Sequence, residues 1–217
     1  ARDFKTRGER DREDLFCATP PLELLRFLMS RQATRRRDGK KRKTVFIDVK
    51  KAHLVPKCHQ DVYVDLPEEA GAGRDESGKL LYWLYGCRPA GQAWEDHYAK
   101  VLMDAGFRRA LSSPVAFHHQ GRDVLVVVHG DDFVVNGIDE ELDFTTELLA
   151  KHYELKVRGR LGDGAKDVRE SDILGRMVRL HDWGVSWEAD ARHRKHVMEY
   201  FGMNEDSKAL TKTGYKE

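Results

Sequence analysis

The chain has 217 residues, of which 40% are hydrophobic, so it is long enough to bury one large core or two smaller ones. Charged residues make up 35%, but the two signs are nearly balanced, which argues against a chain that is disordered throughout. The apolar runs fall well short of the roughly 18–20 residues that a membrane span needs, and the charged start is unlike a signal peptide. We therefore expect a globular protein with no membrane partner.

The formal net charge of +1 hides an uneven distribution of charge. Residues 1–60 carry 17 Lys/Arg and 8 Asp/Glu, whereas residues 61–217 carry 21 and 29. A basic first part beside an acidic remainder favours a protein that meets phosphates on one side and cations on the other, although a solvated charged surface explains it equally well. The three cysteines have no CxxC pair, which indicates neither a disulfide framework nor a zinc site and fits a reducing compartment.

The first half of the chain predicts one helix, a basic loop and two strands. Thr19-Pro20-Pro21 predicts a helix start with Thr19 as the N-cap, followed by a buried stripe at Leu22, Leu25, Leu28 and Met29. Residues 34–43 (TRRRDGKKRK) predict a solvated or phosphate-facing loop, with a nuclear-targeting run as the less favoured interpretation. Residues 44–47 predict a buried strand that ends at Asp48, and residues 61–67 a half-exposed strand that Pro67 stops.

The second half predicts a buried hairpin among helices and further strands. The apolar run from Val124 to Val128, the tip at residues 129–132 (HGDD) and the return at residues 133–135 predict two paired strands. Apolar spacing predicts helices at 94–105, 139–153 and 193–201, and strands at 155–161 and 173–180, with another segment starting at 185. This mixture predicts an α+β fold rather than a doubly wound one.

Two adjacent aspartates, Asp131 and Asp132, lie at the tip of an otherwise apolar hairpin. Asp and Gly favour turns, so the pair is compatible with an ordinary turn. The alternative is a metal site with Asp48, which follows a neighbouring buried strand, as the third carboxylate. Clustered carboxylates need cations to neutralise them, and hard oxygen ligands suit Mg²⁺. Two such ions about 3.5–4 Å apart can clamp the attacking and leaving oxygens of a phosphoryl transfer.

The order of the motifs resembles the reverse transcriptase of copia-type LTR retrotransposons, the RNA-dependent DNA polymerase domain of a Pol polyprotein. Residues 46–54 (FIDVKKAHL) resemble its first aspartate motif, and residues 84–94 resemble "LYGLKQAPRAW". Residues 129–132 stand in the place of "YVDD". Further similarities in the same order lie at 16–33, 61–67, 106–117, 153–156 ("F.MKDLG"), 173–175 ("FLGIEV") and 201–203 ("FGM").

The resemblance implies the fingers, the palm and part of the thumb of a right-hand polymerase, with an antiparallel palm sheet packed on helices. All of residues 1–217 would form one reverse transcriptase domain. Residues of about 1–45 and 55–95 would be fingers, 46–54 and 96–190 palm, and 191–217 the start of the thumb. Because the fingers and thumb look incomplete, we expect the isolated chain to be inactive or nearly so.

The resemblance also implies a role for particular residues. Asp48, Asp131 and Asp132 would be catalytic and, with the backbone carbonyl of Val49, would hold two Mg²⁺ ions, for which Mn²⁺ could substitute. The nucleotide would meet His53, Pro89, Gln92 and Lys156, although a solvated strand-end position explains Lys156 equally well. The primer and template would meet His129, Gly130 and Gly175. The implied reaction is attack of a primer 3′-hydroxyl on a deoxynucleoside triphosphate.

Several departures from the family pattern surround these carboxylates. His53 stands where the family has an aromatic residue that blocks the sugar 2′-hydroxyl. Pro89 and Gln92 replace a glutamine and an arginine, and His129-Gly130 replaces Tyr-Val. A catalytically degenerate nucleic-acid-binding domain is therefore the alternative function. A two-metal nuclease would use similar carboxylates but does not explain the order of the motifs.

The expected partners are an RNA template, a DNA primer or duplex, deoxynucleoside triphosphates and the rest of the Pol polyprotein. In that polyprotein integrase would lie upstream and RNase H downstream. Nucleic acid would be held mainly through its phosphates, so binding should depend on salt. The expected location is intracellular: the cytoplasm, including virus-like particles, or the nucleus.

Overall fold

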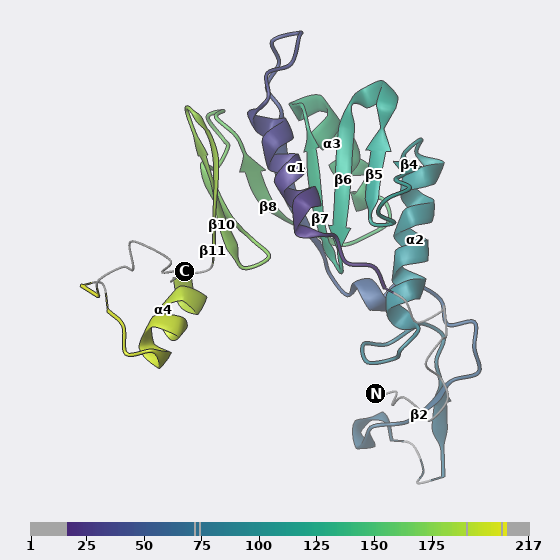
Figure 1. Ribbon diagram of the computed structural model, residues 1–217. Coiled ribbons are helices and arrows are strands. Elements are labelled where there is room, and N and C mark those ends of the chain that lie inside the picture. Colours follow the sequence, from purple (N-terminus) through teal and green to yellow (C-terminus); the bar gives the residue numbers. More distant parts are fainter. Residues whose placement is uncertain (1–16, 72, 74, 190, 205, 208–217) are drawn as a thin grey trace, which may run out of the picture.

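Six antiparallel strands form the central sheet of the computed structural model, which describes residues 17–71, 73, 75–189, 191–204 and 206–207 (Figure 1). The strands lie in the order β4 (Arg108–Arg109), β5 (Ala116–His119), β6 (Val124–His129), β7 (Asp132–Gly137), β1 (Lys43–Val49) and β8 (Leu155–Leu161). The predictions for the first part of the fingers, residues 1–16, and for the end of the thumb segment, residues 208–217, lie outside the described residues. The mixed α+β class is confirmed.

The described chain also contains four α-helices, three short 3-10 helices and two smaller sheets. The α-helices are α1 (Leu22–Ala33), α2 (Ala90–Asp104), α3 (Asp139–Ala150) and α4 (Ala191–Tyr200). One small sheet pairs β2 (Tyr63–Asp65) with β3 (Ser77–Lys79). The other contains β9 (Glu170–Ile173), β10 (Arg176–His181) and β11 (Gly184–Ala189). No helix of the described residues is long and apolar enough to cross a membrane.

The predicted hairpin forms the middle of the central sheet. β6 pairs with β7 so that His129 lies opposite Asp132, and β7 pairs on its other side with β1, where Asp132 lies opposite Asp48. Every residue from Val124 to Val128 is buried. A strand buried on both faces needs apolar side chains at every position, which explains the unbroken run of this segment.

Two hydrophobic cores cover the two faces of this sheet. Residues on one face, such as Ile47, Val126 and Phe133, pack against α2 and α3. Residues on the other face, such as Phe46 and Val134, pack against α1 and the sheet of β9, β10 and β11. In Figure 1, α1 crosses the front of the central sheet and α3 lies behind it. The helix α1 therefore packs against the central sheet.

Two predictions about element ends are wrong. Pro21, not Thr19, is the N-cap of α1, and no side chain caps this helix. Residues 173–180 do not form one strand, because the chain reverses between β9 and β10. Leu174 and Gly175 both have positive φ, 51° and 71°, so they make a tight turn inside an apolar run whose composition had indicated a continuous strand.

Strand β8 contains a bulge that changes which way its side chains point. Val157 lies opposite Ile47, but Arg160 lies opposite Val45, so two residues of β8 oppose one residue of β1. Gly159, at the bulge, has φ of +105°, a conformation that side-chain-bearing residues rarely adopt. Arg158 and Arg160 therefore serve opposite faces of the sheet: Arg158 reaches Asp48, whereas Arg160 pairs with Asp139 and Asp143 of α3.

Candidate active site

The turn that joins β6 and β7 presents Asp131 at one end of the central sheet. Gly130 and Asp131 form a two-residue turn, and Gly130 has φ of +62°, as the first central position of a type II′ turn requires. The indole Nε1 of Trp94 donates a 2.8 Å hydrogen bond to the Gly130 carbonyl. The backbone N–H of Val49 donates a 2.9 Å hydrogen bond to the Asp131 carbonyl. The turn is therefore held from α2 and from β1.

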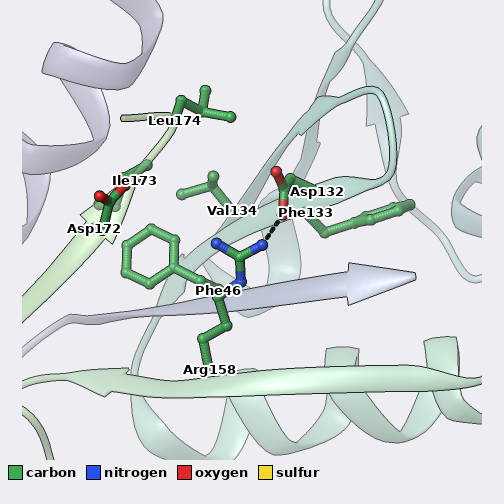
Figure 2. Close-up of a pocket in the computed structure, with 8 residues that line it drawn as sticks. All are labelled: Phe46, Asp132, Phe133, Val134, Arg158, Asp172, Ile173 and Leu174. Atoms are coloured by element: carbon green, nitrogen blue, oxygen red, sulfur yellow. Dashed lines mark ion pairs between the residues drawn. The ribbon is translucent and has the colours of Figure 1, made fainter. Parts of the chain in front are cut away.

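Asp48 and Asp132 lie directly opposite each other on β1 and β7. Opposed residues of an antiparallel pair place their Cβ atoms about 4.5–5.5 Å apart, so two such carboxylates repel each other. Arg158 of β8 lies next to both: its Nη2 is 3.3 Å from Asp48 Oδ2 and 3.3 Å from Asp132 Oδ1. Figure 2 shows the guanidinium of Arg158 directed at Asp132. One cationic group therefore lies within ion-pair distance of both carboxylates and offsets part of their negative charge.

The environment of Asp132 favours its neutral form. Burial raises the pKa of the Asp132 carboxyl above its usual range, and the charges of Asp131 and Asp48 raise it further. Arg158 and, to a smaller extent, His129 act against this rise. Burial, the largest cause, keeps the pKa of Asp132 raised even beside an arginine, and carboxyl groups with shifted pKa values are typical of functional sites.

His53 lies close enough to the turn for its charge to be affected by Asp131. Burial lowers the pKa of the His53 imidazole, and the Asp131 carboxylate opposes that shift. The ring of His53 lies 4.6 Å from the ring of Tyr85, measured between centroids, at a tilt of 32°. The segment after β1 and the segment before α2 therefore meet beside the carboxylates. The predicted nucleotide residue His53 lies near Asp131.

Magnesium suits this donor set in its chemistry and its sign. The carboxylates of Asp48 and Asp132 already hold a cationic group, and their oxygens are the ligands that Mg²⁺ prefers. In its geometry, however, the site does not gather three carboxylates around one point. No group of three or more His, Cys, Asp or Glu side chains within the described part of the chain is arranged to hold a metal ion. The predicted arrangement of Asp48, Asp131 and Asp132 around one cation site is not found among the described residues.

The other residues predicted to meet the nucleotide have mixed surroundings. Pro89 is buried at the N-cap of α2, which leaves little surface for a ligand. Gln92 donates a 2.9 Å hydrogen bond from Nε2 to Asp96 Oδ1 within the same helix. Lys156 is exposed on β8 and lies opposite Asp48, which agrees both with a role near the site and with a solvated strand position.

The residues predicted to meet the primer come from two segments near Asp132: the turn between β6 and β7, and the turn between β9 and β10. His129 is its cross-strand partner, and Gly130 is an exposed turn residue. Gly175 follows Leu174 in the turn between β9 and β10, where its N–H donates to Asp172 Oδ1 at 3.0 Å. This turn is close to the carboxylates, because Leu174 shares a small cavity with Asp132 and Arg158 (Figure 2). The fold therefore brings a segment far along the chain to the site.

The basic loop at residues 34–43 lies at the opposite end of the central sheet from the carboxylates (Figure 1). Two of its arginines, Arg36 and Arg42, form ion pairs with Asp123, as Arg31 of α1 also does. These contacts give the loop a structural part in joining α1 to the start of β6. The loop also lines a cavity of about 650 Å³ together with the turn between β10 and β11.

Sequence reasoning missed Arg158 and the role of Trp94. Arg158 lies two residues after Lys156, and side chains two apart in a regular strand share a face, so the sequence could place these two side chains together; only the pairing of β8 with β1 places them beside Asp48. Trp94 was expected to pack in the core, which its 1% exposure confirms. Nothing in the sequence indicated its hydrogen bond to the turn.

Fold and site together define a mixed α+β domain that carries carboxylates at the turn of a central antiparallel hairpin. A family model described as "Reverse transcriptase (RNA-dependent DNA polymerase)" matches residues 1–164. The chain therefore belongs to the reverse transcriptase family, and this membership implies binding of a nucleic-acid template and deoxynucleoside triphosphates. A search of curated proteins found no significant match.

Proposed function

We propose that the chain is part of an RNA-directed DNA polymerase of the copia type, which transfers nucleotides with two Mg²⁺ ions. The observation that carries this proposal is the pairing of Asp48 with Asp132 beside the Asp131 turn, in a member of the reverse transcriptase family. Because these strands are the buried centre of the sheet, the carboxylates lie on a rigid support. Positioning of this kind supplies much of the rate in phosphoryl transfer.

Each residue has a part in this mechanism. Asp48, Asp131 and Asp132, with the carbonyl of Val49, would hold the ions, which when bound would neutralise charge on the reacting phosphate oxygens. His53, beside Tyr85, would limit the space for the sugar 2′-hydroxyl. Trp94 and Val49 would keep the turn in position through their hydrogen bonds. The turn at Gly175 would contact the primer strand.

The wider setting belongs to the same proposal. The chain would be one segment of a Pol polyprotein, between integrase and RNase H, with the right-hand fingers and palm and the start of a thumb. It would act inside the cell on an RNA template with a DNA primer. Its grip on nucleic acid would be mainly through phosphates and would weaken as salt increases.

A second candidate function is a nucleic-acid-binding domain that has lost catalysis. The pairing of Arg158 with both Asp48 and Asp132 favours it, because the position of a metal is then taken by a side chain. The burial of Pro89 at the N-cap of α2 also favours it. Both candidates bind nucleic acid, so only a catalytic measurement separates them.

Primer extension is the test of this function. We expect a version of the chain lengthened at both ends to extend a DNA primer on an RNA template with Mg²⁺ or Mn²⁺. Asp131→Asn should abolish extension and leave template binding nearly unchanged. Asp182→Asn is the matched control, because it also removes one carboxylate but from a side chain that is 98% exposed. Binding without extension in every version would support the degenerate domain instead.

A further inference from the structure

Arg158 is the only cationic side chain among the described residues that forms an ion pair with Asp48 or Asp132, and it does so with both. The side chain comes from β8, the edge strand of the central sheet, and the bulge at Gly159 separates its direction from that of Arg160. The exposed Lys156, although opposite Asp48 in register, forms no such pair within the described chain. The arrangement is thus specific to Arg158.

In the metal-free protein, the pairing of Arg158 with Asp48 and Asp132 reduces the repulsion between the two carboxylates. Two carboxylates on opposed positions of neighbouring strands repel each other unless a proton or a cation intervenes. Asp131, in the adjoining turn, adds to the negative charge at Asp132. A guanidinium at this place supplies one positive charge to two carboxylates, which is the sign of charge that a metal ion would bring.

We propose that Arg158 is a built-in counter-cation that occupies the Asp48–Asp132 pair in the metal-free protein and competes with divalent metal ions for it. This inference rests on the proposed function in that the metal is the one that the polymerase reaction needs. Metal binding then requires Arg158 to withdraw from the carboxylates. The metal affinity of this site is accordingly set by Arg158 as well as by its ligands.

The geometry of the two ion pairs is that of a weak interaction, from which a metal ion can displace the Arg158 side chain. A single nitrogen serves both carboxylates at 3.3 Å, which is longer than the roughly 2.7–2.9 Å of a strong charge-assisted hydrogen bond. The side chain of Arg158 is 38% exposed, so it can turn towards water. Partly exposed ion pairs contribute little, and a divalent ion carries twice the charge of a guanidinium.

Binding of Mn²⁺ to the chain without substrate tests this proposal. Titration followed by electron paramagnetic resonance gives the Kd and the number of ions bound. We expect Arg158→Leu to lower the Kd roughly five- to tenfold, a factor that corresponds to losing two weak ion pairs. Arg158→Lys keeps the charge on a less well-matched group, so its Kd for Mn²⁺ should lie between those of the unaltered chain and Arg158→Leu. Asp48→Asn, added to Arg158→Leu, should remove the gain.

Arg160→Leu is the matched control variant. It removes the same charge from the same strand and also breaks two ion pairs, those with Asp139 and Asp143, but on the other face of the sheet. We expect it to change the Kd for Mn²⁺ at the Asp48 site less than twofold. An equal gain of affinity in Arg158→Leu and Arg160→Leu would show that net charge, not occupation of the carboxylates, sets the affinity, and would overturn the proposal.

Thermal unfolding gives a second, independent measurement. In EDTA, Arg158→Leu should unfold at a lower temperature than the unaltered chain, because its carboxylates repel without a partner. Added Mn²⁺ should raise its Tm more than it raises that of the unaltered chain. The same Mn²⁺ response in both would contradict the proposal.

The two proposals fail in different ways. If the lengthened protein extends primers but Arg158→Leu binds Mn²⁺ no more tightly, the counter-cation is refuted and the polymerase stands. If Arg158→Leu binds Mn²⁺ more tightly but no version extends a primer, the polymerase is refuted and the counter-cation stands.

Discussion

Replacing Trp94 with phenylalanine should show how much this side chain contributes by its hydrogen bond to the carboxylate turn together with its packing in the core. Trp94 is 1% exposed, and its ring makes edge contacts with Tyr98, Phe133 and Tyr153. Its Nε1 donates the 2.8 Å hydrogen bond to the carbonyl of Gly130. Phenylalanine keeps an aromatic ring at this position but loses the donor and part of the buried volume.

The loss can be worked out from these contacts. A hydrogen bond of this kind contributes about 0.5–1.5 kcal/mol, and water can replace it in part because Gly130 is exposed. The smaller ring leaves a cavity in a close-packed core, which costs about 1–2 kcal/mol more. We therefore expect Trp94→Phe to lower the free energy of unfolding by about 1.5–3.5 kcal/mol. For a chain of this size the fall in Tm is roughly 3–14 °C.

Trp187 offers a matched control for the same substitution. Its Nε1 is buried and has no hydrogen-bond partner among the described residues, and its ring packs only at the margin of the second core. Trp187→Phe therefore removes an unsatisfied donor, and we expect it to cost about 1 kcal/mol or less. Thermal unfolding of both variants by circular dichroism is the assay. Equal losses in the two variants would refute the part assigned to the Gly130 hydrogen bond.

Two further predictions concern the titration of the site and the sugar of the nucleotide. Because the pKa of Asp132 is raised in the folded protein, its stabilising effect is present below the usual carboxyl range and is lost as pH rises through the raised pKa. Asp132→Asn should therefore raise Tm in EDTA at pH 7 by an amount equivalent to less than about 1 kcal/mol and leave it nearly unchanged near pH 3. Asp65 is exposed, so Asp65→Asn is the control and should leave Tm unchanged at both pH values. An effect of Asp132→Asn on Tm that does not depend on pH would contradict this prediction. Because imidazole is smaller than phenyl and can form hydrogen bonds, His53→Phe should raise the ratio of deoxy- to ribonucleotide incorporation by the lengthened protein; an unchanged ratio would show that this position is not the sugar gate.

Local pattern was enough to predict the strands that carry the carboxylates. The run from Val124 to Val128 is short, apolar throughout and mostly β-branched, which indicates a strand buried on both faces. The strand at residues 155–161 was predicted with the bounds that β8 has. The position of Asp48 at the end of a buried strand was likewise visible, although only its pairing with Asp132 places the two side chains together.

Features that depend on another part of the chain had weaker signals or none. Leu174 and Gly175 reverse the chain inside a segment predicted as one strand, because β9 and β10 pair antiparallel on either side of them. The arginines of the basic loop looked free for phosphate, yet Arg36 and Arg42 meet Asp123, more than 80 residues further along the chain.

The sequence by itself determined which segments form the central hairpin and that its turn carries two aspartates, because these follow from residue type and from a period of two along a strand. The tertiary structure decided that Arg158 reaches Asp48 and Asp132 while Arg160 reaches α3. That choice depends on one extra residue in β8 at Gly159, which reverses the facing of every side chain beyond it. The periodicity of one strand does not predict its register with the neighbouring strand. Which cationic side chain lies next to the carboxylates is therefore decided only when β1 and β8 pair.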